Sequence, residues 1–393
     1  MRILVTNWMD PENPHAGGAE VHLVEVFARL VEQGHQVTLI SAGWSGGASR
    51  ARVRGIEVIR VGNRWTFALA GPAAVRHALR ENRFDVMVED LNKLPLATPR
   101  WSSVPVVVVV HHLWGLAAFR ATWAPVAWLT WAGERSLARG YRHSRFIAVS
   151  ESTRNELIKR NISPARVSVV FNGVERPPDS IGLTHRAGEP TLLYLGRLQG
   201  YKRVHRLLDA AARLLKERHS IRVVVAGTGP CRGRLERRAK ALGLREVATF
   251  PGRVDEATKW TLFREAWVNV VPSVIEGWGL TVLEAAMVGT ASVVANVPGL
   301  RDSVRHFETG LVAPQGEMLD LTAAIRYLLL NPGEVERLGS AARVWAETLT
   351  WDRAAAATEA VLNEACYQLA DPARSPLDVP DRNLLGLPLP RKP

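Results

Sequence analysis

"RILVTN" (residues 2–7) begins the segment that decides the fold. A second apolar run, "QVTLISA" (36–42), follows after "GAEVHLVEVFARLVEQGH" (18–35). The middle stretch repeats apolar side chains at helical spacing, and one face carries Val21, Val24, Phe27, Ala28 and Val31. Gly34 closes the pattern, as glycine commonly does at helix ends. A strand, a helix and a strand with short connections predict a βαβ unit.

Later apolar runs extend this pattern over most of the chain. They lie at 84–90, 104–110 and 145–150, and then at 191–196, 221–227, 247–252, 268–273 and 291–296. The runs do not alternate with polar residues, so both faces of each strand are expected to be buried, as in a parallel sheet covered by helices. We therefore predict an α/β chain of two doubly wound, Rossmann-like domains facing across a cleft, with ligands outside the carboxyl ends of the strands.

Two segments without periodicity mark the expected boundaries. Residues 175–190 are polar and rich in Pro and Gly, which favours an interdomain linker. The tail 371–393 has six prolines in 23 residues, which favours disorder. We predict an N-terminal domain at 1–178 and a C-terminal domain at 188–350.

Composition limits the class of protein. A length of 393 residues favours two domains over one core, and 22% charged residues are typical of a soluble chain. The apolar stretch 104–110 is far shorter than the about 20 residues that span a bilayer. "MRILVTNWMD" reads as a first strand rather than a secretory leader, so we expect a cytoplasmic protein. Cys231 and Cys366 fit no metal or redox spacing, so we expect reduced thiols.

The net charge of +12 favours an anionic partner. A nucleotide, an anionic membrane surface and nucleic acid are the three classes that fit. Nucleic-acid binding would call for basic residues interleaved with aromatics on a recognisable module, and the sequence shows none.

Two cations follow the first strand of the second series. In "LGRLQGYK" (195–202), Arg197 and Lys202 stand five positions apart. In a loop after a parallel strand, both can reach one anionic ligand, and a guanidinium fork with a mobile ammonium suits a diphosphate. An ordinary solvated loop has the same composition.

"EGWGLTVLEAA" (276–286) follows another strand and places Glu276 and Glu284 eight positions apart. Its two glycines disfavour helix up to Gly279, and the sequence favours helix from Leu280 onward. The amides of Gly279, Leu280 and Thr281 then form a helix N-terminus that can bind phosphate. A buried Trp278 and a plain capped helix are the alternative.

The first domain has two further candidates. "PHAGGAE" (14–20) opens the first helix with Gly17 and Gly18, which let a ligand approach the backbone, although the GxGxxG spacing is missing. "VVVVVHHLWG" places His111 and His112 at a strand end. Adjacent strand residues point to opposite faces, which argues against one shared metal. For His112 a packing role is the alternative. The chain contains no Asp-x-Asp pair, which a hard cation on a sugar nucleotide would commonly use.

Taken in order, these motifs resemble the retaining glycosyltransferases of family 4, which have the GT-B fold. The resemblance covers roughly residues 1–365. The matching stretches are "GGAEVHLVEVFARLVEQGHQVTLIS", "HH", "IAVSESTRNEL", "VVFNGV", "LGRLQGYKRVHRLLDA", "VVVAGTGP", "VPSVIEGWGLTVLEAAMVG" and "TWDRAA". The glutamate pair matches the E-x7-E signature of the family.

The resemblance implies a role for each matching residue. Arg197 and Lys202 would hold the donor diphosphate, helped by the amides of Gly279, Leu280 and Thr281. Glu284 would bind the ribose, and Glu276 the donor sugar. Gly17 and Gly18 would approach the phosphates, and His111 would lie beside the reaction centre. The helix 351–370 would pack back on the N-terminal, acceptor-side domain, which leaves 188–350 as the donor-binding domain.

The sequence departs from the family pattern at three positions, all of which bear on selection of the base or sugar. Thr228 stands where an acidic residue is frequent, Trp278 where Phe is usual, and Asp302 where Glu is common.

The implied activity is transfer of a hexose-type sugar from a nucleotide-diphosphate sugar to an acceptor hydroxyl, with retention and without a metal or other cofactor. Cations and a helix N-terminus would stabilise the leaving diphosphate. A lipid-linked or cell-envelope glycan acceptor and a soluble small-molecule acceptor stay open. So does a GT-B epimerase or phosphorylase.

Residues 113–140 point to an acceptor-side surface. We predict that Phe119, Trp123 and Trp131 form one helical stripe, with Pro125 perturbing the helix and arginines nearby. Aromatics beside arginines suit an anionic membrane interface, and peripheral binding to the inner face of the membrane follows as a hypothesis. A hairpin packed on the core is the alternative.

Overall fold

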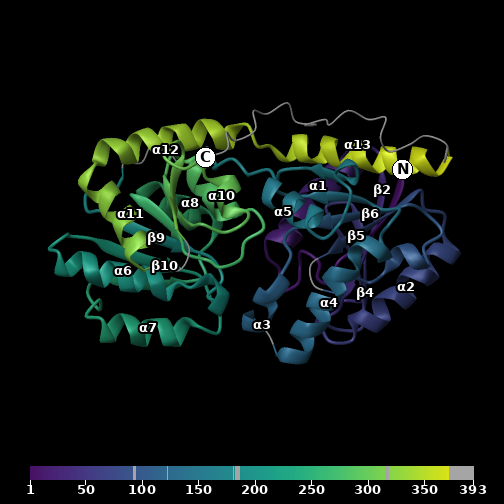
Figure 1. Cartoon of the computed structure of the whole chain (residues 1–393), viewed down its shortest axis with the longest axis horizontal. Helices are drawn as coiled ribbons and strands as arrows, with labels where there is room; N and C mark the ends of the chain where they lie inside the picture. Colours follow the sequence, from purple (N-terminus) through teal and green to yellow (C-terminus); the bar gives the residue numbers. More distant parts are fainter. Residues whose placement is uncertain (92–93, 122, 180, 182–185, 315–317, 371–393) are drawn as a thin grey trace. The chain divides into compact units, whose positions relative to one another are not determined.

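A computed structural model describes residues 1–91, 94–121, 123–179, 181, 186–314 and 318–370 (Figure 1). These residues form two compact units, and the chain passes between them at Gly173–Val174 and again at Leu349–Thr350. The expected tail 371–393 and the linker positions 180 and 182–185 lie outside the described residues.

The N-terminal unit is built on one sheet with helices packed against it. Its described strands are β1 (Arg2–Thr6), β2 (Gln36–Ala42), β3 (Arg50–Val53), β4 (Ile56–Val61), β5 (Val86–Leu91), β6 (Val106–Val110), β7 (Arg145–Ala148) and β8 (Val167–Val169). They lie in the order β3-β4-β2-β1-β5-β6-β7-β8, all parallel except β3. The helices are α1 (Gly18–Glu32), α2 (Phe67–Glu81), α3 (Ala118–Ala121), α4 (Ala124–Gly140), α5 (Glu151–Ile158) and α13 (Trp351–Ala370), with short 3-10 turns at Thr98–Arg100, Gly115–Ala117 and Pro164–Arg166.

The helix α1 is buried on two sides. One side packs on β2 and β4 of the sheet, and the other meets α13, which runs beside it in Figure 1. Arg29 donates to Asp352 at 2.6 Å across this helix pair. Double coverage buries His22, Leu23 and Val26 as well as part of the predicted face. The predicted Val21 is exposed, and the predicted Val31 is only half-buried. The prediction of a single apolar face therefore missed most of the buried residues of this helix.

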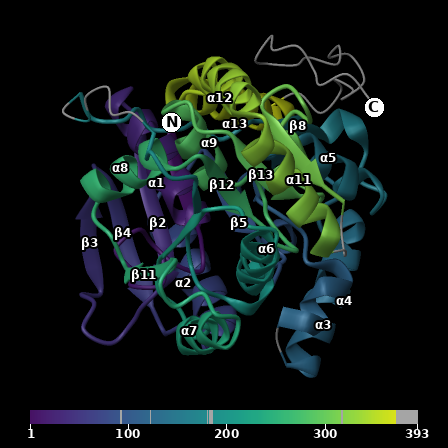
Figure 2. The same ribbon diagram turned by 90° about the vertical axis from the view of Figure 1, so that its left-hand side faces the viewer.

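The C-terminal unit has a smaller, fully parallel sheet. Its described strands are β9 (Thr191–Leu195), β10 (Arg222–Ala226), β11 (Ala248–Gly252), β12 (Val268–Val271), β13 (Ser292–Ala295) and β14 (Gly310–Ala313), in the order β11-β10-β9-β12-β13-β14. The helices are α6 (His205–Lys216), α7 (Arg232–Ala241), α8 (Glu256–Glu265), α9 (Leu280–Met287), α10 (Leu300–Ser303), α11 (Met318–Leu330) and α12 (Pro332–Glu347), with a 3-10 turn, η4, at Gly200–Lys202. Helices α6 and α11 lie side by side (Figure 2).

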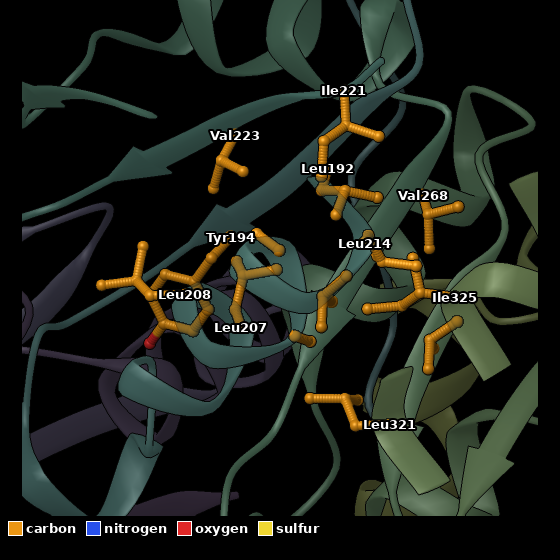
Figure 3. Close-up of a cluster of buried hydrophobic side chains, with 14 of the residues drawn as sticks. Leu192, Tyr194, Leu207, Leu208, Leu214, Ile221, Val223, Val268, Leu321 and Ile325 are labelled. Carbon is orange, nitrogen blue, oxygen red and sulfur yellow. The ribbon is translucent and has the colours of Figure 1, made fainter. Parts of the chain in front are cut away.

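The core of this unit lies where α6 and α11 meet the sheet. Leu192 and Tyr194 of β9 and Val223 of β10 belong to one buried cluster with Leu207 of α6 and Ile325 of α11 (Figure 3). All five side chains are buried, so the sheet is rigidly backed at the strands whose carboxyl ends carry the candidate residues.

Each sheet has one switch point, on either side of which successive strands are added toward opposite edges of the sheet. In the N-terminal sheet this point lies between β1 and β5, and in the C-terminal sheet between β9 and β12. Loops diverge at such a point and leave room for a ligand at the carboxyl ends of the strands. Gly17 follows β1, Arg197 follows β9 and Glu276 follows β12, so sequence candidates lie at both points.

No helix in the described part of the chain combines the length and the apolar character needed to cross a bilayer.

Candidate functional site

The C-terminal site begins with a lysine and a glutamate from two adjacent loops. Lys202 closes the turn η4 after β9, and its Nζ donates to Oε1 of Glu276, which follows β12. Ser273 donates to the same oxygen at 3.2 Å. Both charged side chains are mostly enclosed, with 14% of Lys202 and 15% of Glu276 exposed. The structure thus brings together two residues that are 74 positions apart, at the switch point of the sheet.

Arg197 is held beside this pair through two tyrosines. Its Nη2 lies 3.3 Å from Oη of Tyr201, and the buried Tyr194 donates to the Arg197 carbonyl at 3.0 Å. The amide of Val274 donates to the Tyr201 carbonyl at 2.9 Å, which ties the β9 loop to the β12 loop. Arg197 and Lys202 therefore belong to one cluster of charged side chains whose loops are held together by hydrogen bonds.

The β9 loop is also packed against the loop after β10. A Cβ added at Gly227 would lie 1.9 Å from the Gly196 carbonyl oxygen, so only glycine permits this approach. The amide of Leu198 donates to the Thr228 carbonyl at 2.8 Å. The "AGTGP" motif thus supports the arginine loop through its backbone, and the side chain of Thr228 is not part of that support.

The helix α9 begins at Leu280, as the sequence predicted, with Gly279 as its N-cap. Gly279 has φ +78° and lacks a side chain that could accept hydrogen bonds from the first-turn amides. The amides of Leu280 and Thr281 therefore form a positive helix end next to the Glu276 loop. Trp278, whose role the sequence left open, is only 2% exposed and is a packing residue.

Glu284 lies one turn into α9 and is paired with a second lysine. Lys259 of α8 donates to its Oε1 at 2.8 Å. Sequence reasoning missed Lys259, because a lysine in an amphipathic helix has the composition of a solvated face. Each glutamate of the signature thus has its own lysine, Lys202 for Glu276 and Lys259 for Glu284.

In the N-terminal unit, Gly17 and Gly18 begin α1 at the switch point of the sheet. Gly17 is the extended N-cap residue, and its amide donates to Oε2 of Glu20 at 2.7 Å. Asn7 donates to the other oxygen of Glu20 at 3.4 Å. Burial and the nearby Asp90 charge raise the pKa of Glu20, while the Gly17 amide opposes that shift. Glu20 therefore fixes the glycine loop, a role that the "GGAE" stretch signals through glutamate three residues after an N-cap.

His111 is buried just after β6 and faces an acid from the neighbouring strand. Its Nε2 lies 3.2 Å from Oδ2 of Asp90 at the end of β5. Burial lowers the pKa of His111, but the charges of Asp90 and Glu20 outweigh burial, and the pKa is raised. The Asp90 carboxylate orients the ring through Nε2. The sequence placed Asp90 in a strand without assigning it a role.

A second histidine backs His111. The ring of His22 packs edge-on against that of His111, with centroids 5.0 Å apart. Burial, together with the His111 charge, lowers the pKa of His22 to about 3, so this ring is neutral. Its Nδ1 lies 2.8 Å from Oδ1 of Asn172, which assigns the proton to Nδ1. His112, by contrast, turns toward the ring of Trp114, with centroids 5.0 Å apart, in agreement with a packing role.

The segment 113–140 differs from the predicted single stripe. The helix α4 starts at Ala124 with Trp123 as its extended N-cap, and Pro125 stands in the first turn, where proline is favoured rather than disruptive. Phe119 belongs to the separate helix α3. Trp131 is half-buried under Arg135, whose guanidinium lies 4.5 Å from the ring centroid. The exposed apolar side chains are instead Leu116, Phe119, Trp123, Val126, Trp128 and Leu129.

Cys231 and Cys366 are free thiols, as predicted. Among the described residues, no three His, Cys, Asp or Glu side chains gather as a metal would require.

Each unit is a doubly wound sheet with helices packed against it and candidate residues at its switch point. Both units have this architecture, and together they define the GT-B class of glycosyltransferases. Over residues 176–345 the chain matches the family "Glycosyl transferases group 1", and over 16–176 it matches "Glycosyltransferase Family 4". The chain belongs to glycosyltransferase family 4 and is a glycosyltransferase.

Curated relatives agree with this assignment. The chain is 35% identical over 295 residues to a D-inositol 3-phosphate glycosyltransferase of Streptomyces bingchenggensis, a match that covers 69% of this chain and 63% of that protein. It is 31% identical to D-inositol 3-phosphate glycosyltransferase 2 of Catenulispora acidiphila, covering 70% of this chain and 68% of the relative. The chain thus spans less than two thirds of the first relative.

Solved structures share the fold. Sucrose-phosphate synthase from Thermosynechococcus elongatus superposes with a TM-score of 0.77 at 18% identity, covering 93% of this chain and 99% of that one. HepE from Anabaena, solved in complex with UDP-glucose, has a TM-score of 0.71 at 18% identity, covering 94% of this chain and 99% of its own.

Proposed function

We propose that this glycosyltransferase moves a hexose-type sugar from a nucleotide-diphosphate sugar to an acceptor hydroxyl, with retention of configuration and without a metal ion or other cofactor. The observation that carries the proposal is the C-terminal cluster, in which Arg197, Lys202 and Glu276 gather at the switch point beside the start of α9. The UDP-glucose complex of a protein with the same fold supports a nucleotide sugar as donor.

Each part of the cluster has a chemical task in this proposal. Arg197 and Lys202, with the amides of Gly279, Leu280 and Thr281, bind the diphosphate and stabilise its charge as the anomeric bond breaks. Lys202 is held by Glu276 before the donor binds, so its ammonium is already placed.

Glu276 contacts the sugar and Glu284 accepts from the ribose hydroxyls. Because Arg, Lys and amides meet the diphosphate charge, the chemistry needs no divalent cation.

The N-terminal residues act on the sugar and the acceptor. We assign His111 to the reaction centre, where its Asp90-oriented ring donates a hydrogen bond to the donor sugar. Gly18 offers its backbone amide to the donor phosphates, and Gly17, whose own amide is held by Glu20, lets them approach the backbone closely. In a retaining transfer, the acceptor proton passes to the leaving phosphate oxygen, so no separate general base is required.

A donor screen tests this function. The chain is incubated with UDP-, GDP-, ADP- and dTDP-sugars, with water as the acceptor of the sugar, and the nucleoside diphosphate released by this hydrolysis is quantified by chromatography. We expect release from one of these donors, and a loss of roughly 100-fold or more in Lys202→Met and Glu276→Gln, the size typical for removal of a preorganised charge-stabilising group. Lys240→Met is the matched control, because Lys240 is exposed on α7. Release from none of the donors, or full activity in both site variants, would refute the proposal.

We further propose that the acceptor is lipid-linked and that the enzyme works in the cytoplasm on the inner face of the membrane. Around the start of α4, Trp123 is 74% exposed and Trp128 57% exposed, and Leu129 beside it is 50% exposed. Arg135 and Arg139 on the same helix are also exposed. Exposed indoles beside arginines suit the interface of an anionic bilayer.

Flotation with phosphatidylglycerol vesicles tests this surface. We expect the wild-type chain to float and the double variant Trp123→Ser, Trp128→Ser to remain in the dense fraction. Trp65→Ser is the control, because Trp65 is a similarly exposed tryptophan before α2. Absence of flotation in the wild type, or equal flotation of the double variant and the control, would contradict membrane docking.

A soluble acceptor is the second candidate. The two relatives described above are named for D-inositol 3-phosphate, which favours a small phosphorylated polyol. Transfer to inositol 3-phosphate at a rate unaffected by vesicles would support this candidate over the lipid-linked one.

A further inference from the structure

Lys259 stands outside every signature motif, yet it is built into the C-terminal site. It projects from α8 toward α9, where its Nζ lies 2.8 Å from Oε1 of Glu284 and 2.6 Å from Oε2 of Glu256. Only 13% of the Lys259 side chain and 18% of Glu284 are exposed, whereas Glu256 is 76% exposed. The contact of Lys259 with Glu284 is therefore enclosed, whereas its contact with Glu256 is open to solvent.

The ammonium is held in place from several sides. Its Nζ lies 4.8 Å from the ring centroid of Trp260, a buried residue of the same helix. Burial lowers the pKa of Lys259, but the charges of Glu284 and Glu256 outweigh burial, and the pKa is raised. Lys259 is thus a permanent cation placed against the Glu284 carboxylate.

The contact leaves the two oxygens of Glu284 in different situations. Oε1 accepts from Lys259, while Oε2 has no hydrogen-bond partner within the described ranges. A carboxylate has about four acceptor sites, so Oε2 can take a hydroxyl donor without disturbing the ion pair. Without Lys259, both oxygens would be equivalent and the side chain would be free to rotate.

We infer that Lys259 is a positioning residue that sets the site's preference for a ribonucleotide over a deoxyribonucleotide, by presenting one carboxylate oxygen of Glu284 to the sugar hydroxyls of the nucleoside diphosphate. This inference rests on the proposed function, because it takes Glu284 to bind the ribose. A site built to accept from a hydroxyl rejects an analogue that lacks it, since the acceptor is then left unpaired. Lys259 also offsets the charge of Glu284, which would otherwise repel the diphosphate.

The test is calorimetric titration of the full chain. The wild type is first titrated with UDP, GDP and ADP, and the tightest ligand is then compared with its 2′-deoxy and 3′-deoxy analogues. We expect the wild type to prefer the ribonucleotide over at least one analogue by roughly tenfold or more. In Lys259→Met the preference should fall to within about twofold, and Lys259→Arg, which keeps the charge, should restore part of it.

Two variants separate positioning from a general effect on the fold. Lys240→Met, at an exposed lysine of α7, should keep the full preference. Glu284→Gln should lose the preference by itself, and adding Lys259→Met should then change it no further, because both act through one carboxylate. The melting temperature of each variant is recorded, since a structural role would lower it without changing the ratio of the two dissociation constants.

The outcomes distinguish this inference from the proposed function. A wild type that binds none of the three nucleotides contradicts both. A wild type that binds and discriminates, with Lys259→Met discriminating equally well, overturns the role of Lys259 and leaves the donor site standing.

Discussion

Gly279 is a position where a single added methyl group should destabilise the C-terminal site. Its φ of +78° lies in the left-handed region, which costs an L-residue about 1–2 kcal/mol. An added Cβ would lie 2.8 Å from Cδ2 of Leu300, a fully buried side chain in a cluster with Val271, Val282, Val294, Val297 and Val304. Overpacking of this kind costs about 1–3 kcal/mol. Gly279→Ala should therefore lower the free energy of unfolding by about 2–5 kcal/mol.

Urea denaturation, followed by tryptophan fluorescence, measures this loss. The matched control is Gly233→Ala in α7, where an added Cβ meets nothing within 4 Å. That change removes glycine from a helix, so it should be neutral or stabilise by up to about 1 kcal/mol. Glycine-to-alanine substitution should thus lower the free energy of unfolding at position 279 and leave it unchanged or raise it at position 233. Gly279→Ala with the wild-type unfolding midpoint would refute the reasoning, because neither the backbone strain nor the clash would then exist.

Three further perturbations follow from the buried groups. Asp90→Asn removes the charge that raises the pKa of His111; a raised histidine pKa stabilises the fold fully below about pH 6.5 and loses that contribution as pH rises through the folded pKa. The variant should thus lose about 1.5–3 kcal/mol at pH 5.5 and less at pH 8.5 by urea titration, and a loss that grows with pH would contradict this sign. Glu20→Ala leaves the Gly17 amide without its acceptor and should cost about 0.5–2 kcal/mol in the same assay, whereas Glu20→Gln keeps an acceptor and should recover most of it; equal losses in both would argue against the cap. Trp278→Phe should cost about 0.5–3 kcal/mol of stability while nucleotide affinity stays within about twofold, because the indole is buried, and a large change in affinity at unchanged stability would return Trp278 to the pocket.

Much of the fold was predictable because its strands are buried on both faces. The runs at 36–42 and 191–196 contain no charged residue, and they correspond to β2 and β9. The strands missed were β3, β4, β8 and β14, of which three lie at sheet edges, whereas the edge strand β11 was predicted. β3 and β8 are short and only partly buried. Edge strands take part in one ladder instead of two, so composition marks them weakly.

The charged cluster of the C-terminal unit was also predictable, because Arg197, Lys202 and Glu276 stand in the loops that follow two strands. The sequence could not show which residues of different helices and loops contact each other. Lys259 meets Glu284 from a different helix, and Gly227 meets Gly196 from a different loop. Both contacts depend on strand order, which is a tertiary property.

The prediction for the segment around α4 misjudged the effect of Pro125 on the helix. Pro125 was expected to perturb a helix that was already running, whereas the helix begins there. Proline is compatible with the first helical turn, where an amide hydrogen is not needed. Because the start of the helix was placed too early, the predicted stripe joined residues that belong to separate helices, α3 and α4.

The central claim is that a nucleoside diphosphate binds at the carboxyl ends of β9 and β12. A crystal structure of the chain with the nucleoside diphosphate released in the donor screen tests it most directly. We predict diphosphate oxygens within hydrogen-bonding distance of Lys202, Arg197 and the amides of Leu280 and Thr281, with the ribose hydroxyls on Glu284. A diphosphate bound away from these residues, or a ribose turned away from Glu284, would contradict the account.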